Sequence, residues 1–144
     1  MKRGIQGLLE GKSEVWSVRS NAKVSQAIAL MADKDIGAVV VIDLGELVGI
    51  LSERDCARRL ALEDRAAKET PVSELMTRDV IAIQPERTID ECMALMTAKH
   101  IRHLPVVEGN KVVGVISIGD IVRAVIQTKS TTIEQLERYI QGYA

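Results

Sequence analysis

One candidate chemical motif occurs twice in this sequence: a glycine, two apolar residues, a serine, two further residues and an aspartate. It runs from Gly49 to Asp55 and again from Gly114 to Asp120, sixty-five residues later. Each copy ends an apolar run typical of a buried strand and opens a segment with helical spacing. A helix N-terminus presents unpaired N–H groups that suit an anion, and a carboxylate there can accept both hydroxyls of a ribose. The motif therefore favours nucleotide chemistry in each copy.

The same residues also have a purely structural interpretation. A serine at the N-cap, followed three residues later by an acidic residue, resembles a capping box, which stabilises a helix by about 1 kcal/mol. A single motif would favour the cap. Two motifs in register, each beginning with a glycine that allows close backbone approach, favour a ligand.

The motif is part of a longer duplication. The same offset places Ala29-Leu30-Met31 on Ala94-Leu95-Met96 and Lys34 on Lys99, without a gap. An ungapped repeat of this length indicates a duplication, and two copies are too few for a solenoid. We therefore expect two similar halves that pack on each other.

The first copy predicts the order β-α-β-β-α. Its strands are expected over 15–18, 38–42 and 47–51, and its helices over 24–34 and from 53 to about 63. The apolar residues of the first helix recur at helical spacing. The β-branched run Ala38–Ile42 is typical of a strand buried on both faces.

The second copy predicts the same order. Its strands are expected over 80–83, 104–107 and 111–116, with helices from 89 and from about 118. A capping box, Thr88 with Glu91, opens the first of these helices. Lys23 occupies the equivalent of Thr88 and cannot cap in that way, so a weaker helix start or another use for the lysine is expected.

Another capping box at Thr131 predicts a separate final helix. This helix would carry Ile133, Leu136, Tyr139 and Ile140 on one face, and that face must dock on the module or on a partner. The domain boundaries that we expect are 8–65 for the first copy, 72–128 for the second and 131–142 for the C-terminal helix.

Composition excludes several classes of protein. The chain has 144 residues, a hydrophobic fraction of 47% and a net charge of −1. The charge gives no general attraction to nucleic acid or anionic lipid, and the few aromatic residues offer little for stacking on bases. No secretory signal and no membrane-spanning run is recognisable. We expect a cytoplasmic protein with neither a nucleic-acid partner nor membrane insertion.

The chemistry of an enzyme is not recognisable in the sequence. There is no Walker lysine, acid–base pair or metal cluster. His100 and His103 would point to opposite faces of an extended segment, and a third metal ligand is missing nearby. Cys56 and Cys92 lie in apolar helical patterns, which predicts reduced, buried thiols rather than nucleophiles. We therefore expect no catalysis and no metal.

The paired motifs and the β-α-β-β-α copies resemble tandem cystathionine β-synthase (CBS) domains, the pair often called a Bateman module. The segment Ile101-Arg102-His103-Leu104-Pro105-Val106-Val107 strengthens this resemblance. It covers roughly residues 8 to 128 and is most similar to small stand-alone bacterial members. The resemblance implies an α/β fold of two pseudo-symmetric repeats plus a C-terminal helix. It also implies a regulatory module that binds adenosine-containing ligands in clefts between the halves.

The resemblance further implies roles for individual residues. The ribose carboxylates would be Asp55 and Asp120, with Ser52 and Ser117 near the ribose or phosphate. The backbone that contacts adenine would lie around two short stretches, Val18 to Ser20 and Ile83 to Pro85.

Phosphate contacts are expected from cationic side chains. In the family's nucleotide sensors a His-Arg pair before this Leu contacts phosphates, and here the order is Arg102-His103. We expect this pair to serve the Asp120 cleft, with Arg54 as the nearest cation to Asp55 and Lys23 as a further contact. Solvated surface charge is the alternative for Arg54, Arg58 and Arg102.

These expectations define one function and two alternatives. The ligand would be an adenine nucleotide, with AMP or NAD favoured over ADP or ATP because the cations are few, and the protein would sense energy or redox state. Apolar residues on both motif helices predict a homodimer, among them Cys56, Ile121, Val122 and Ile126. The alternatives are a structural dimerisation module with empty clefts, or a regulator acting in trans on an enzyme or transporter.

Overall fold

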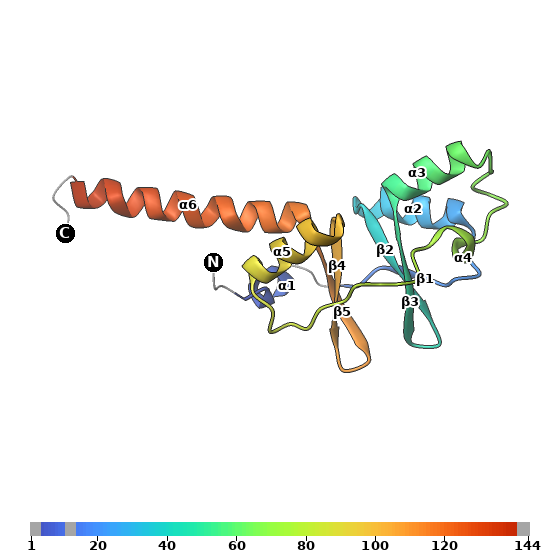
Figure 1. The fold of residues 1–144 in the computed structure, drawn as a ribbon, viewed down its shortest axis with the longest axis horizontal. Helices are drawn as coiled ribbons and strands as arrows, with labels where there is room; N and C mark the ends of the chain where they lie inside the picture. Colours follow the sequence, from blue (N-terminus) through green and yellow to red (C-terminus); the bar gives the residue numbers. More distant parts are fainter. Residues whose placement is uncertain (1–3, 11–13, 141–144) are drawn as a thin grey trace.

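Two small sheets lie side by side in the computed structural model, and one long helix extends away from them (Figure 1). The structure describes residues 4–10 and 14–140, and residues 128–133, 135–136 and 138–140 by their backbone alone. Strands β3 and β5 of the two sheets contact each other. The expected mixed α/β architecture of two similar halves is confirmed.

The first half has the predicted order of elements. A three-stranded sheet, in the order β1-β2-β3, has β1 parallel to β2 and β2 antiparallel to β3. The first strand is shorter than predicted, and the first helix has the predicted limits. The elements are β1 (Ser17–Val18), α2 (Val24–Lys34), β2 (Ala38–Asp43), β3 (Glu46–Ser52) and α3 (Glu53–Leu62).

The second half repeats this arrangement except for its first strand. Its elements are α5 (Ile89–Lys99), β4 (His103–Glu108), β5 (Lys111–Ser117) and α6 (Ile118–Ile140). The strand predicted over 80–83 is reduced to a single bridge between Ile83 and Val106. The reason is local: the backbone turns just before it, where the Val80 N–H donates to the Arg78 carbonyl at 2.9 Å.

The duplication extends to details of the backbone. Both α2 and α5 end in a left-handed residue, Asp35 with φ 53° and His100 with φ 54°. The next residue in each half donates its N–H to a methionine carbonyl, at 3.0 Å for Met31 and 3.1 Å for Met96. Both helices therefore end in the same way.

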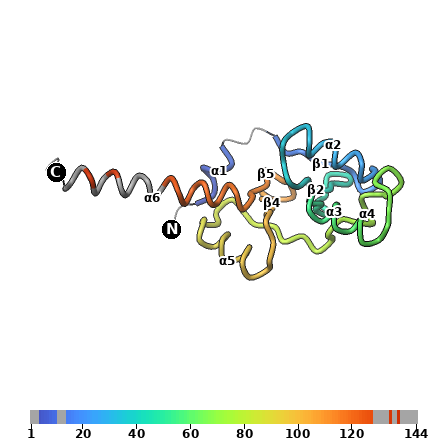
Figure 2. Tube along the Cα trace, turned by 90° about the horizontal axis from the view of Figure 1, so that it is seen from above, coloured from blue at the N-terminus to red at the C-terminus, as the bar shows by residue number. Residues whose placement is uncertain are grey.

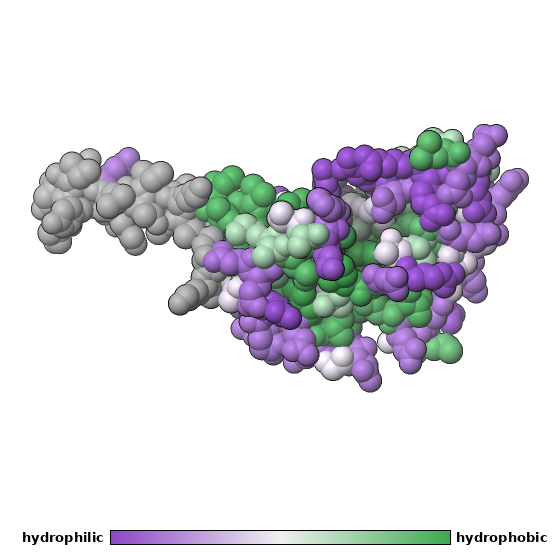
Figure 3. Space-filling view, viewed as in Figure 1, coloured by the Kyte–Doolittle hydropathy of each residue, from purple (hydrophilic) through white to green (hydrophobic). Residues whose placement is uncertain are grey.

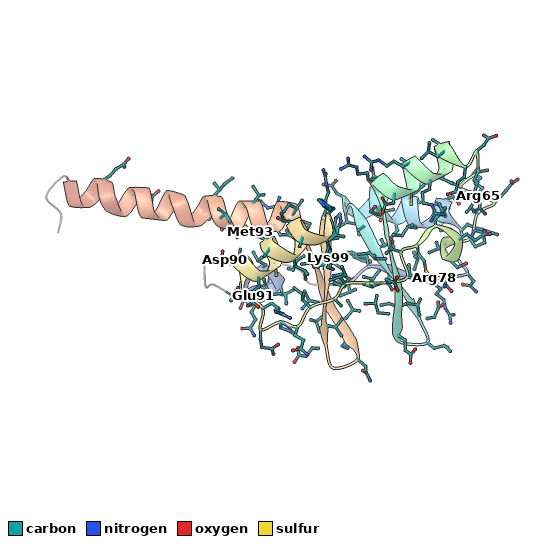
Figure 4. The ribbon with its side chains drawn as sticks, viewed as in Figure 1. Arg65, Arg78, Asp90, Glu91, Met93 and Lys99 are labelled. Atoms are coloured by element: carbon teal, nitrogen blue, oxygen red, sulfur yellow. The ribbon has the colours of Figure 1, made fainter. Side chains whose placement is uncertain are left out.

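The predicted capping box of α5 is confirmed. The Thr88 hydroxyl accepts from the Glu91 N–H at 3.1 Å, and the Glu91 carboxylate accepts from the Thr88 N–H at 3.2 Å. Figure 4 labels Glu91 beside Asp90 at this helix start. Two acidic residues in the first turn also favour the positive end of the helix dipole.

Helix α2 begins without a side-chain cap from Lys23, as predicted. The Lys23 ammonium has no lone pair to accept a hydrogen bond. Carbonyls from the connecting segment replace it: Val24 donates to Thr70 at 2.8 Å, and Ser25 donates to Ala67 at 3.0 Å. The lysine side chain is exposed at this helix start.

Each half takes part of its core from a segment that belongs in sequence to the other half. The short helix α1 (Gln6–Glu10) lies beside β5 (Figure 2), and the preceding Ile5 is fully buried in the second half's core. The helix α4 (Val72–Leu75), from the connecting segment, packs on α2, α3 and β3 of the first half. The two halves are therefore interlocked through their connections.

The motif glycines are explained by this interlocking. A β-carbon on Gly49 would lie 2.6 Å from the Met76 sulfur, and one on Gly114 would lie 2.5 Å from a Leu9 methyl carbon. Such distances are too short for any real β-carbon contact. The close approach that the sequence suggested for a ligand is used here by the chain's own side chains.

The C-terminal helix differs from the prediction. Helix α6 runs unbroken from Ile118 to Ile140, so no separate helix starts at Thr131. In a helix interior each N–H already bonds to a carbonyl one turn earlier, so the Thr131 pattern has no unpaired donor to cap. Residues 141–142 of the predicted helix lie outside the described residues.

The expected dimer contacts are also partly revised. Cys56 and Ile121 are 1% and 0% exposed and belong to the cores of the two halves, so they do not reach another subunit. Val122 and Ile126 are 48% and 57% exposed on α6. Figure 3 shows apolar surface where α6 leaves the body of the molecule.

Candidate functional site

A cleft of about 960 Å³ opens between the two halves. The first half contributes the start of α3, and the second half contributes the connecting segment, the end of α5 and the start of β4. Figure 4 labels two residues adjacent in sequence to ones that line the cleft: Lys99, the last residue of α5, and Arg78 on the connecting segment. The volume is within the range of small-molecule sites.

The first motif leaves its carboxylate open to this cleft. The Ser52 hydroxyl accepts from the Asp55 N–H at 3.0 Å and so caps α3. Among the residues whose side chains the structure describes, none donates a hydrogen bond to the exposed Asp55 carboxylate. The serine therefore has the capping role, and both carboxylate oxygens of Asp55 are available to a ligand.

The second motif forms a complete capping box. The Ser117 hydroxyl accepts from the Asp120 N–H at 3.1 Å, and one Asp120 oxygen accepts from the Ser117 N–H at 2.8 Å. The other oxygen accepts from the Arg123 guanidinium at 2.7 Å. The structural interpretation of the motif thus describes this copy fully.

Three arginines on the cleft have no ion pair with any residue that the structure describes. They are Arg54 and Arg58 on α3 and Arg102 just before β4, and all three are exposed. Four other arginines are ion-paired in the described part of the chain, namely Arg59, Arg65, Arg87 and Arg123. Unpaired guanidinium groups from both halves make the cleft suited to phosphate.

Arg102 and His103 line the cleft of Asp55, while their backbone lies beside the second motif: His103 pairs with Ser117, and the Arg102 carbonyl accepts from the Ile118 N–H at 2.8 Å. The approach to β4 in the second half faces the α3 motif of the first half. His103 accordingly lies next to Gly37, which precedes β2. The sequence repeat matches each residue to its counterpart but does not determine which half it faces.

The segments proposed to contact adenine are displaced from this cleft. Ile83 and Pro85 are buried, and Ile83 belongs to the second half's core. The cleft is instead lined by residues slightly earlier in the chain, including Thr77, Val80 and Ile81. The predicted adenine contacts were placed too late in the chain, because bends and irregular backbone, rather than a strand, occupy residues 78–82.

The equivalent residues of the first half also have other surroundings. Val18 pairs with Val41 in the sheet. The Ser20 hydroxyl and N–H both donate to the Asp43 carboxylate, the hydroxyl through a short hydrogen bond. The hydroxyl first, and then the N–H, hold the pKa of Asp43 below its ordinary value. Ser20 thus fastens a turn, and Lys23 likewise lies outside the cleft.

Some residues on the cleft were not predicted to contact a ligand. Gly37, Thr77 and Asp79 line it, and so does His100, which was considered only as a metal ligand. Arg58, which was weighed against solvated surface charge, lies three positions after Asp55 and so on the same face of the helix. Thr77 and Asp79 carried no such signal, because their part of the connecting segment follows neither the helical nor the strand period.

The cysteines and the wider search for metal ligands complete the site. Burial raises the pKa of Cys56 to about 11 and also raises the pKa of Cys92. Both thiols are buried, as predicted, and neither favours the thiolate form. In the described part of the chain, His, Cys, Asp and Glu nowhere form a group of three that could hold a metal. No described helix combines the length and apolar character needed to span a membrane.

Comparison with known proteins agrees with this architecture. The family model for the CBS domain matches twice, at residues 12–62 and 72–127. The mitochondrial CBS domain-containing protein CBSX3 of Arabidopsis thaliana is 39% identical over 124 residues, which span 83% of this chain and 60% of the plant protein.

Solved structures extend the likeness to three dimensions. A CBS-domain protein from Burkholderia ambifaria MC40-6 is 44% identical with a TM-score of 0.82, and the match covers 86% of this chain and 94% of that one. The CBS domain pair of protein MJ0100, in complex with 5′-methylthioadenosine and S-adenosyl-L-methionine, is 28% identical with a TM-score of 0.72 and coverages of 79% and 93%.

The fold, with its cleft between two matching halves, is that of a tandem pair of small α/β domains. With the family model matched in both halves, this chain belongs to the CBS-domain family.

Proposed function

We propose that this chain is a non-catalytic regulatory module that binds an adenosine phosphate in the cleft between its two CBS domains. The observation that carries the proposal is the open carboxylate of Asp55 beside three unpaired arginines contributed by both halves. A carboxylate of this kind can accept both ribose hydroxyls, while the arginines bind phosphate. The adenosine ligands of the MJ0100 pair support the nucleoside part.

The charge of the cleft favours a phosphorylated ligand. S-adenosylmethionine carries a net positive charge, because its sulfonium and ammonium groups outweigh its one carboxylate, so Arg54, Arg58 and Arg102 favour it less than a phosphate. 5′-Methylthioadenosine offers these arginines no anion. AMP and NAD are the ligands that we propose first, with ADP and ATP next. The protein would then report energy or redox state.

Regulation would follow from the position of the cleft. A ligand that contacts both halves shifts their relative arrangement if it binds one arrangement better than another. The projecting helix α6 offers a surface through which a second copy or a regulated enzyme or transporter could sense that change. We propose a homodimer as the working form.

Calorimetric titration tests the proposal. The purified chain is titrated with AMP, ADP, ATP, NAD, S-adenosylmethionine and 5′-methylthioadenosine. Asp55→Asn should weaken binding of the preferred nucleotide about ten- to hundredfold, because an amide accepts at one atom only. Asp64→Asn, at the exposed far end of α3, is the matched control. Absence of heat with every ligand at millimolar concentration would refute the proposed function.

A second set of variants tests the phosphate contacts. Arg102→Ala should weaken binding of the adenosine phosphates roughly tenfold through loss of a charge-assisted hydrogen bond. It should leave any binding of 5′-methylthioadenosine unchanged. Equal losses for both ligands would mean that Arg102 supports the shape of the cleft rather than the phosphate.

A further inference from the structure

We infer that the chain binds one nucleotide rather than two: the cleft of Asp55 is the site, and the Asp120 motif is closed by Arg123. The inference rests on the proposed function and assigns its stoichiometry. It reverses the expectation from sequence, in which Arg102 and His103 made the second motif the better site.

The two motif aspartates differ in the hydrogen-bond partners of their carboxylate oxygens. In the second motif one oxygen of Asp120 holds the Ser117 N–H and the other holds Arg123, at 2.8 Å and 2.7 Å. The Asp120 side chain is only 12% exposed. A ribose diol needs both oxygens, so a ligand would have to displace both partners. The exposed Asp55 has no such partner among the side chains that the structure describes.

The arginines that follow the two motifs also differ in their contacts. Arg58 and Arg123 are counterparts in the repeat, each three residues after its motif aspartate. Arg58 lines the cleft without an ion pair to Asp55, whereas Arg123 folds back onto Asp120.

The residue just before the motif aspartate accounts for part of this difference. A β-carbon on Gly119 would lie 3.5 Å from the Arg123 guanidinium, already in van der Waals contact. The counterpart of Gly119 is Arg54, whose longer side chain would extend beyond that point. The glycine therefore leaves room for Arg123 to close the second motif.

The two halves also differ at the positions of Arg102 and His103. The counterparts of Arg102 and His103 in the first half are Gly37 and Ala38. The repeat therefore supplies the second motif with no counterpart of these two cations. The Arg123 guanidinium lies 2.7 Å from the Asp120 carboxylate, which neutralises its charge. A phosphate would gain little there.

The test is a crossover between two matched substitutions in the full-length chain. Calorimetry with the preferred nucleotide should give about one ligand per chain for the parent protein. Asp55→Asn should lower affinity roughly ten- to hundredfold with little change in melting temperature. Asp120→Asn should lower the melting temperature of the unliganded protein and change affinity less than about twofold.

The opposite pattern overturns the inference. Two ligands per chain with similar affinity, or a tenfold loss of affinity in Asp120→Asn, would show that the second motif is a site. If Asp120→Asn folds poorly, Arg123→Gln keeps the capping box and should bind the nucleotide in the Asp55 cleft with unchanged affinity; a tenfold loss of affinity in that variant would show that the second motif is the site and would also refute the inference. No binding to the parent protein would overturn the proposed function and this inference together, whereas two equal sites would overturn the inference alone.

Discussion

His103 lies against Gly37: its Nε2 atom is 3.3 Å from the point where a β-carbon on Gly37 would stand. The two residues belong to different halves of the chain, and both line the cleft. The absence of a side chain at position 37 therefore sets the position of an imidazole on the opposite wall. This contact links the width of the cleft to one glycine.

Substitution of that glycine should affect binding more than stability. In Gly37→Ala the new methyl group would push the His103 ring by a few tenths of an ångström, because the contact is tighter than most. We expect a loss of nucleotide affinity of about two- to tenfold, with a free energy of unfolding within about 1 kcal/mol of the parent. Calorimetry and urea unfolding measure the two effects. Unfolding at a much lower urea concentration would show that Gly37 is needed for the fold instead.

The motif glycines make a matched pair for a stability test. A β-carbon on Gly49 would meet both the Met76 sulfur at 2.6 Å and the Thr77 carbonyl at 3.1 Å. On Gly114 it would meet only the end of the Leu9 side chain, which can rotate. We expect Gly49→Ala to cost about 1–3 kcal/mol of unfolding free energy and Gly114→Ala less. Urea unfolding of both variants decides this, and the reverse order would contradict the packing described here.

Acid should destabilise the protein through Asp43. The Ser20 hydroxyl, and secondly its N–H, hold the pKa of this carboxyl below the ordinary value of 3.8. The unfolded chain therefore binds the proton more readily, so this stabilisation is present above about pH 4 and is lost as the pH falls through the folded-state pKa.

Asp43→Asn should thus be less stable than the parent at neutral pH, and the difference should shrink as the pH falls below about 4. Urea unfolding across this range is the measurement, with Asp64→Asn as the control. A difference that stays constant with pH would mean that Asp43 acts through packing and not through its charge.

The exposed apolar side chains on α6 should hold two subunits together. Val122 and Ile126 lie one helical turn apart and are 48% and 57% exposed. Val122→Glu would place a charge in an apolar contact without disturbing the core. We expect a dimeric mass for the parent and a monomeric mass for this variant by light scattering at micromolar concentration. Gln127→Glu is the control, and an unchanged mass in Val122→Glu would exclude this face as the contact.

Most helices and strands could be predicted from the sequence, but the packing of the two halves against each other could not. Helix α2 was predicted with correct limits because its apolar residues keep one period and polar turns flank it. The capping box at Thr88 was equally clear, because its chemistry is local. In contrast, Arg102 lies on the same cleft as Asp55 because of how the two halves pack, and no local sequence pattern predicts that packing.

The state of the two motif carboxylates also lay beyond prediction. Both motifs have an arginine three residues after the aspartate, so spacing treats Asp55 and Asp120 alike. Part of the difference comes from the room that Gly119 leaves for the Arg123 side chain. The unbroken α6 was missed for a related reason: a capping pattern at Thr131 marks a helix start only if the preceding residues are not already helical.

The exchange of core segments between the halves has a consequence for folding. Ile5, at the start of the chain, is fully buried with the last strands, while Val72 is fully buried with the first. A fragment cut between residues 65 and 72 would leave each piece with an apolar gap that only the other piece can fill. Although the sequence is a duplication, the two halves should unfold as one cooperative unit. Heat should therefore melt the chain in a single transition, and neither repeat should persist as a folded fragment.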